Sequence, residues 1–257
     1  HTRSFHVTGV QTCALPICYI EELNAADYPF DDMVHEDFKK FPGHWKDGKL
    51  YSVMVRFGLL GVSYNTKAVS DAEAASYKCF WKPELKGKVG HFDWHLPNLG
   101  QISLYNGNGK NLWNIDKGQW DKVKATAKSL RPQVGGFFDY GGTFNGLKTG
   151  EMLAMAGIGD WITGVLERDG APVKSMIPKE GGIQFTESYS IGKGSSKAAI
   201  VKKFIQYMMS PDGQVKSANM AAYPANIVTN KGRKALQDKN PKEAQRSNQV
   251  DGSDRKS

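Results

Sequence analysis

The chain has 257 residues, of which 40% are hydrophobic, and its 34 Lys and Arg against 26 Asp and Glu give a formal net charge of +8. This composition can bury a core in one large or two modest domains, and no apolar run approaches the roughly 20 residues of a membrane-spanning helix. In the tail after Asn230, residues 231–253 carry six basic side chains against three acidic ones, and no basic residues form a stripe interleaved with aromatics. The charge therefore favours a solvated tail over a nucleic-acid site.

The two ends of the chain are not typical of a folded domain. Residues 7–17, VTGVQTCALPI, resemble one reading frame of a sequencing-library adapter, and the last four residues, DRKS, resemble the same adapter from its other end. The opening also lacks the apolar core of a secretory signal. We therefore expect residues 1–17 and 254–257 to be adapter-derived and unstructured, the signal peptide to be missing, and the chain to be a fragment.

The first half of the chain is predicted to contain short strands and helices. In chain order these are strands over residues 51–57 and 59–64, a short helix over 70–77, a strand over 89–94 and a helix over 96–105. Gly58 is expected to separate the first two strands.

The second half alternates more regularly. The expected elements are helices over 119–130, 143–149, 160–168 and 197–209, and strands over 134–138, 152–158, 173–177 and 184–191. The last of these helices is amphipathic, with six apolar residues on one face: Ile200, Val201, Phe204, Ile205, Met208 and Met209. Ser210 and Pro211 then predict the start of another helix. The alternation indicates an α/β fold with mostly parallel sheets.

The segment GIGDWITG, residues 157–164, lies between an expected strand and an expected helix. Glycines at 157 and 159 allow backbone amides to approach a ligand, and a helix start favours negative charge. A dinucleotide fingerprint needs a third glycine at position 162, where the chain has Ile162. The pattern favours a ligand cleft or a structural turn over a nucleotide site.

The segment HFDWH places His91, Asp93 and His95 two residues apart, on one face if it is a strand. Two imidazoles and a carboxylate are ligands for zinc or iron. At about 3.3 Å per residue, however, three such side chains on a straight strand spread over roughly 13 Å, which is too far for one ion. We therefore expect histidines that are exposed, or buried with partners, and no metal site.

The sequence shows no pattern of catalytic residues. Ser63, in GVSYN, lacks the closing glycine of a nucleophile elbow, and no spacing pairs two carboxylates for acid–base work. Aromatic residues instead occur near carboxylates at expected turns and strand ends: Trp161, Phe185, Tyr189 and Tyr223, with Asp160 and Glu187. Aromatic walls with a carboxylate suit an ammonium group, although each aromatic alone is equally consistent with a core anchor. We expect a binding protein without a cofactor; the alternative is a metal- or nucleotide-dependent α/β enzyme.

Residues 173–227 resemble the periplasmic solute-binding proteins of ABC importers, and among them the spermidine/putrescine-binding type. The matching motifs are PKEGG before a strand, SPDGQ at the end of a helix, and AYPAN where the family has a Gly-Tyr-Pro turn. The segments YSVMVRFGLLGVSYNTKAV, WKPELKGKV and GEMLAMAGIGDW precede these motifs in the family's order. The similarity spans about residues 19–230.

The resemblance implies a type II periplasmic-binding-protein fold, in which hinge strands join two α/β lobes that hold ligand in the cleft between them. Lobe 1 would comprise residues 18–87 and 183–253, and lobe 2 residues 88–182, with crossings near 87–89 and 181–185. Family members begin with a signal peptide and further strand–helix units. We therefore expect an incomplete lobe 1, bare strand edges, and poor or no ligand affinity in the isolated polypeptide.

The resemblance also assigns binding residues. Phe185 falls on the family's cleft tryptophan, Glu187 on the carboxylate two residues later, and Tyr223 on the tyrosine of the Tyr-Pro turn. Together with the aromatic pattern, this gives seven expected ligand-binding residues: Phe185, Glu187, Tyr223, Trp161, Asp160, Asp93 and Tyr189.

Departures from the family's pattern widen the range of expected ligands. Of its acidic pair in lobe 2, at most Asp93 remains, and Asn98 stands near the second position. Its aromatic in the first hinge segment is replaced by Val55, beside the basic Arg56. Because each buried ammonium needs a partner, a monoamine, an amino-acid-like solute or another small polar solute is nearly as consistent with the sequence as a polyamine.

The resemblance implies the substrate-binding component of an ABC transporter. It would capture a small polar, amine-bearing solute and present it to a transporter permease. The expected location is the periplasm or the extracellular face of the membrane. The expected state is a monomer that does not bind nucleic acid.

Overall fold

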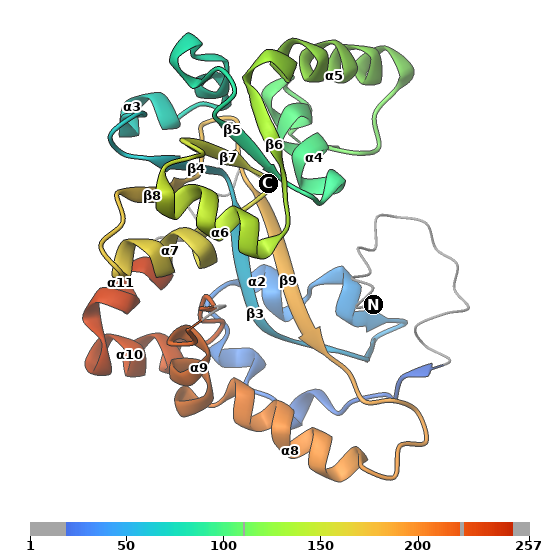
Figure 1. Cartoon of the computed structure of the whole chain (residues 1–257). Coiled ribbons are helices and arrows are strands. Elements are labelled where there is room, and N and C mark those ends of the chain that lie inside the picture. The colour runs from blue at the N-terminus through green and yellow to red at the C-terminus, as the bar shows by residue number, and fades with distance from the viewer. Residues whose placement is uncertain (1–18, 110, 222–223, 249–257) are drawn as a thin grey trace. The chain divides into compact units, whose positions relative to one another are not determined.

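The computed structural model describes residues 19–109, 111–221 and 224–248 (Figure 1). These residues form two compact units. The first unit contains residues 19–57, 186–220 and 225–248. The second contains residues 58–109, 111–185, 221 and 224.

The chain passes between the units within two long strands, β3 (Val53–Leu60) and β9 (Ile183–Tyr189), which pair as a two-stranded sheet. The second passage lies between Phe185 and Thr186, within β9. The first lies earlier than the expected crossing near 87–89, because residues 58–87 pack with the second unit. β3 also continues through Gly58, where the sequence predicted a break between two strands.

The second unit is built on a five-stranded sheet with the order β6-β5-β7-β4-β8. Its strands are β4 (Val62–Asn65), β5 (Val89–Phe92), β6 (Val134–Phe138), β7 (Ala154–Ala156) and β8 (Val173–Met176). β5 is parallel to β6 and β7, whereas β4 is antiparallel to β7 and β8. The sheet is therefore mixed, and the expectation of mostly parallel pairing is wrong because β4 enters the sheet in the opposite direction.

Helices cover this sheet. They are α3 (Asp71–Ala74), α4 (His95–Tyr105), α5 (Lys117–Leu130), α6 (Tyr140–Thr149) and α7 (Asp160–Arg168), with 3-10 turns at Tyr77–Trp81, Pro83–Leu85 and Arg131–Gln133. α4 packs against β5 and β7, α6 against β5, β6 and β7, and α7 against β8.

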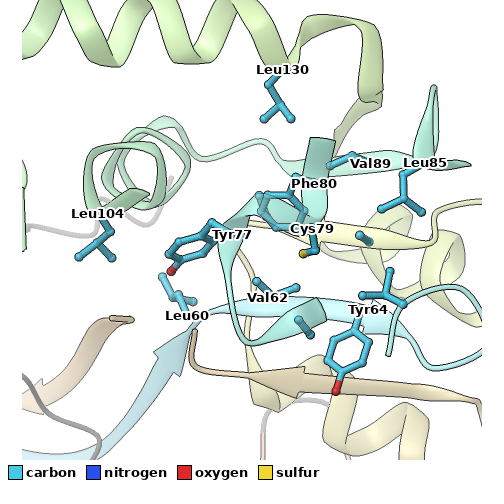
Figure 2. Packing of buried hydrophobic residues seen from close by; sticks show 14 of the residues in the cluster. Leu60, Val62, Tyr64, Tyr77, Cys79, Phe80, Leu85, Val89, Leu104 and Leu130 are labelled. Carbon is cyan, nitrogen blue, oxygen red and sulfur yellow. The ribbon is translucent and has the colours of Figure 1, made fainter. Parts of the chain in front are cut away.

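Buried side chains lie on both faces of the five-stranded sheet. On β7, Ala154 and Ala156 belong to one apolar cluster and Met155 to another, as the alternation of a strand requires. Figure 2 shows the first cluster, in which Tyr77 and Phe80 lie close to strand residues such as Val62. The second cluster includes Leu147 of α6 and Ile162 of α7. The sheet is thus a middle layer between helices.

The first unit has little sheet of its own. It contains β1 (Trp45–Lys46) and β2 (Lys49–Leu50), the helices α2 (Glu36–Lys39), α8 (Ala198–Met209), α9 (Pro211–Ala218), α10 (Asn230–Lys239) and α11 (Pro241–Asn248), and 3-10 turns at Ala25–Asp27, Phe30–Asp32 and Pro42–His44. β1 and β2 form a two-stranded antiparallel sheet.

Residues 230–248 form two packed helices, whereas the charge pattern suggested a solvated tail. α10 and α11 pack on each other, and Leu236 and Ala244 are buried in a cluster with residues of α9. Glu243 is buried as well and is bound by Arg246 at 2.5 Å. The four lysines of this segment, Lys231, Lys234, Lys239 and Lys242, are exposed, whereas the Arg246 side chain is only 10% exposed.

The prediction for α8 is partly wrong. Ile205 and Met209 are buried as expected, but Ile200 is 65% and Phe204 49% exposed. The helix therefore buries a narrower stripe than its six apolar residues suggested. Ser210 caps the following helix as predicted, since its hydroxyl accepts a hydrogen bond from the N–H of Gly213.

Within the described ranges, no helix is both long and apolar enough to cross a membrane.

Candidate functional site

Two aromatic residues expected to bind ligand meet in the second unit. Trp161 is the second residue of α7 and Phe185 lies on β9, and their ring centroids are 4.7 Å apart at an interplanar angle of 80°. This edge-to-face arrangement is favourable for aromatic rings. Gly58 leaves room for it, because a Cβ there would lie 2.3 Å from the Phe185 ring. Both rings are half-buried, so the pair still presents some aromatic surface.

In the first unit, the Glu187 carboxylate on β9 is bound by Arg56 on β3. Arg56 Nε donates to Oε2 of Glu187 at 2.6 Å and Nη2 donates to Oε1 at 2.5 Å. This bidentate geometry is the strongest arrangement of a guanidinium–carboxylate pair. The Arg56 side chain is 17% exposed and that of Glu187 is 44% exposed. The carboxylate expected to meet a ligand cation is thus already neutralised by a protein cation, although much of its surface remains open.

Tyr189 lies two residues beyond Glu187, on the same face of β9. Its ring packs on Phe204 of α8, with centroids 5.6 Å apart. On the opposite face, the Oγ of Ser188 lies 2.6 Å from Nε2 of the buried His44. Burial lowers the pKa of His44 to about 4, so this imidazole is neutral at pH 7. His44 therefore adds no charge beside β9.

Asp160 is half-buried and is the first residue of α7, directly after the glycine turn. Both glycines of this turn make close contacts with other parts of the protein. The N–H of Gly157, which has φ +77°, donates to Oε1 of Gln101 at 2.7 Å. A Cβ on Gly159 would lie 2.1 Å from the backbone oxygen of Leu59. Both glycines are therefore explained as structural turn positions, and nothing here supports the nucleotide interpretation.

The HFDWH segment is not one strand. β5 ends at Phe92 and α4 begins at His95, so the three candidate ligands do not share a strand face. His91 is buried, whereas Asp93 and His95 are exposed. In the part of the chain that the structure describes, no three His, Cys, Asp or Glu side chains gather into a group able to hold a metal ion.

Asn98 stabilises the junction between β5 and α4. Its Nδ2 donates to the carbonyl oxygens of Phe92 at 2.6 Å and of Trp94 at 2.9 Å. Its Oδ1 is therefore left to accept from Nδ1 of His91 at 3.0 Å. Burial lowers the pKa of His91, and this hydrogen bond opposes the shift. Asn98 thus holds the backbone in place, while the neighbouring Asp93 is exposed and open to a ligand.

The structure therefore sorts the predicted site residues by unit. Trp161 and Phe185 meet in the second unit, and Glu187 and Tyr189 share a strand face in the first. Tyr223 lies outside the described residues. Their roles in binding remain predictions.

Sequence reasoning did not place Arg56 among the site residues. It was noted only as a basic neighbour that disfavours a polyamine. The available signal was that Arg56 is the one charged residue in VMVRFGLL, the sequence of β3. A charge that interrupts an apolar strand needs a partner, and the partner is Glu187.

Comparison with known proteins gives a consistent result. A model of the bacterial extracellular solute-binding proteins matches residues 17–242. The spermidine/putrescine-binding periplasmic protein of Escherichia coli K12 is 27% identical over 187 residues, which cover 70% of this chain and 51% of the relative. The chain thus spans about half the length of the curated relatives it matches.

Solved structures show the same fold. A GABA receptor superposes with a TM-score of 0.69 at 18% identity, covering 89% of this chain and 65% of the receptor. The spermidine/putrescine substrate-binding protein of Streptococcus pneumoniae superposes with a TM-score of 0.66 at 16% identity, covering 89% and 71%. The fold expected from the sequence is confirmed. The relatives named are binding proteins and not enzymes.

Proposed function

The chain belongs to the bacterial extracellular solute-binding proteins, and on that premise we propose that it forms part of the substrate-binding component of an ABC importer. The proposal includes capture of a small polar, amine-bearing solute and its delivery to a transporter permease. The observation that carries it is the family match over residues 17–242, which spans both units. Since the chain covers about half of its curated relatives, the activity of the whole protein is proposed and not demonstrated.

The amine in this proposal is supported by the names of the relatives and by the chemistry of the chain. Spermidine and putrescine are amines, and so is GABA. In this chain, the Trp161 and Phe185 rings and the Glu187 carboxylate are the groups that suit an ammonium ion. The proposed ligand residues are those expected from the sequence.

No bond is made or broken in this function. Ligand binding favours one conformation of the protein, and the permease would recognise that conformation. The periplasm or the outer face of the membrane is the proposed location, because the curated relatives are periplasmic proteins.

A thermal-shift panel of polyamines, amino acids, divalent metals and nucleotides tests the proposal. Because the isolated chain is expected to bind weakly, each ligand is tested up to millimolar concentrations. At least one amine should then raise the melting temperature, since a ligand at 100 times its Kd stabilises the folded state by about 2.7 kcal/mol. Stabilisation by nucleotides or metals with no response to any amine would favour the enzyme alternative and contradict the proposal.

Two variants test whether binding of an amine depends on Glu187. Glu187→Gln should weaken binding of an amine, because the ammonium loses its carboxylate partner. Asp31→Asn, which removes an exposed carboxylate elsewhere in the first unit, should leave binding unchanged. Equal losses in both variants would indicate general electrostatics and not a site at Glu187.

A further inference from the structure

The Arg56–Glu187 pair bears on which solute the protein selects. These two residues are the only charged ones in β3 and β9, whose sequences are VMVRFGLL and IQFTESY. Each is partly accessible, Glu187 more so than Arg56. This two-stranded sheet therefore carries one positive and one negative group, held together and summing to zero charge.

A polyamine does not match the zero net charge of the Arg56–Glu187 pair. Each ammonium removed from water needs an anionic or well-aligned polar partner. The single carboxylate on these strands is already engaged through both oxygens by a guanidinium. A dication at Glu187 would have to compete with Arg56 for the carboxylate, and would leave three positive charges against one negative charge.

A zwitterion does match the zero net charge of this pair. A solute with one ammonium and one carboxylate is neutral, as the Arg56–Glu187 pair is. Exchange of partners would give a guanidinium bound to the ligand carboxylate and a Glu187 carboxylate bound to the ligand ammonium, so that every charge keeps an opposite neighbour. Arginine is well suited to this exchange because its planar fork fits one carboxylate as well as another.

Neighbouring side chains suit a ligand with a short apolar spacer. Tyr189 shares the face of β9 with Glu187, and its ring packs on Phe204. Aromatic surface beside a carboxylate favours both the ammonium and the methylene groups next to it.

We propose that the solute is a zwitterion bearing one ammonium and one carboxylate, and that Arg56 determines specificity by binding the carboxylate while Glu187 binds the ammonium. This inference rests on the proposed function and narrows its ligand class.

Matched series of probes test it on this chain. The amino acids run from 3-aminopropanoate to 6-aminohexanoate, and the diamines from 1,3-diaminopropane to 1,6-diaminohexane, so that each pair differs in one terminal group. Titration calorimetry at pH 7 should show that the best amino acid binds at least tenfold more tightly than the best diamine. Tighter binding of a diamine would overturn the inference and leave the proposed function standing. If neither series binds, the inference is wrong. If, in addition, no polyamine or amino acid raises the melting temperature in the thermal-shift panel, the proposed function is wrong as well.

Variants separate recognition from stability. Arg56→Gln should lower amino-acid affinity at least tenfold and shift the preference towards the diamines. Arg56→Lys keeps the positive charge but lacks the planar guanidinium, so its amino-acid affinity should lie between those of the wild type and Arg56→Gln. Lys234→Gln breaks an exposed ion pair with Asp238 in the same unit and should change no affinity. Circular dichroism and melting curves show whether each variant folds. Unchanged amino-acid affinity in folded Arg56→Gln or Arg56→Lys would overturn the inference.

Discussion

The two units bury their apolar side chains in different ways. The second unit places them on both faces of a five-stranded sheet. In the first unit, β1 and β2 have two residues each, and most of the remaining structure is helical. Of the six large apolar side chains that are exposed in the described residues, five belong to the first unit: Tyr19, Ile200, Phe204, Tyr207 and Met220.

This contrast indicates that local stability is uneven. Backbone hydrogen bonds in the middle of a covered sheet open only in large unfolding events, whereas short, exposed elements open locally. We therefore expect the first unit to exchange its amide hydrogens faster than the second. The candidate site residues belong to both units, and Arg56 and Glu187 lie in the first unit, which we expect to be the less stable one.

The largest effect is expected from cavities in the two cores. Leu147 of α6 and Leu236 of α10 are both fully buried. Replacing a buried leucine by alanine costs about 2–5 kcal/mol, with the higher values where the surroundings cannot relax. We expect Leu147→Ala to reach the upper part of this range, because it lies under the sheet, and Leu236→Ala the lower part. Urea unfolding followed by circular dichroism measures both.

Hydrogen exchange of the same variants assigns each loss to a unit. Leu147→Ala should speed exchange in β5 and β7, and Leu236→Ala in α9 and α11. Leu147→Met, which conserves volume, should cost less than about 1.5 kcal/mol. A greater loss for Leu236→Ala than for Leu147→Ala would contradict the proposed difference between the units.

The second prediction concerns the stability of the protein at low pH. Burial lowers the pKa of His44 from 6.5 to about 4, so the unfolded chain binds a proton more readily than the folded one. The stability from this neutral imidazole is present above about pH 6.5 and is lost as the pH falls towards 4, by up to about 3 kcal/mol at 1.36 kcal/mol per pKa unit.

His44→Gln should flatten the pH dependence of unfolding free energy in that window. Glutamine can still bond to Ser188 but does not titrate. His95→Gln, which removes an exposed imidazole in the second unit, serves as the control. If both variants keep the wild-type slope, the acid sensitivity of the first unit does not come from His44.

Local sequence patterns predicted much of the second unit. The expected bounds of β6 and α7 agree with the observed Val134–Phe138 and Asp160–Arg168, because a turn-forming residue precedes each apolar segment, Pro132 before β6 and Gly159 before α7. The break at Gly58 was wrong because this glycine is required by the Phe185 ring, which comes from a distant part of the chain. The direction of β4 was missed for the same reason: its antiparallel pairing with β8 is a long-range contact.

The candidate site shows the same limit. Periodicity and motif resemblance singled out Glu187 and the aromatic residues. The partner of Glu187 lies 131 residues away, and no local pattern reports such a pair. Arg56 could be recognised as a charge in need of compensation, but only the fold identifies what compensates it.

Helix caps offer a smaller, matched test of the two units. In the second unit, Asp116 and Gln119 cap α5 reciprocally, with bonds of 2.8 and 3.1 Å. In the first, Oγ1 of Thr229 accepts from the N–H of Gly232 at 3.2 Å. Asp116→Ala and Thr229→Ala should each cost about 1 kcal/mol in thermal unfolding. Asp116→Asn should retain most of the cap, and no loss in either alanine variant would show that these helix ends do not limit stability.

The smallest effect is expected on the exposed side of α8, where sequence reasoning expected burial. Ile200 is 65% exposed, so Ile200→Lys should change the unfolding free energy by no more than about 0.5 kcal/mol, as is usual for surface substitutions. Ile205 is fully buried on the same helix, and Ile205→Val should cost about 0.5–1.5 kcal/mol because a buried methyl group is lost. Chemical unfolding of the two variants compares one residue type on two sides of a helix. A substantial loss for Ile200→Lys would mean that this side of α8 is covered in solution, and that the first unit exposes less apolar surface than the contrast with the second requires.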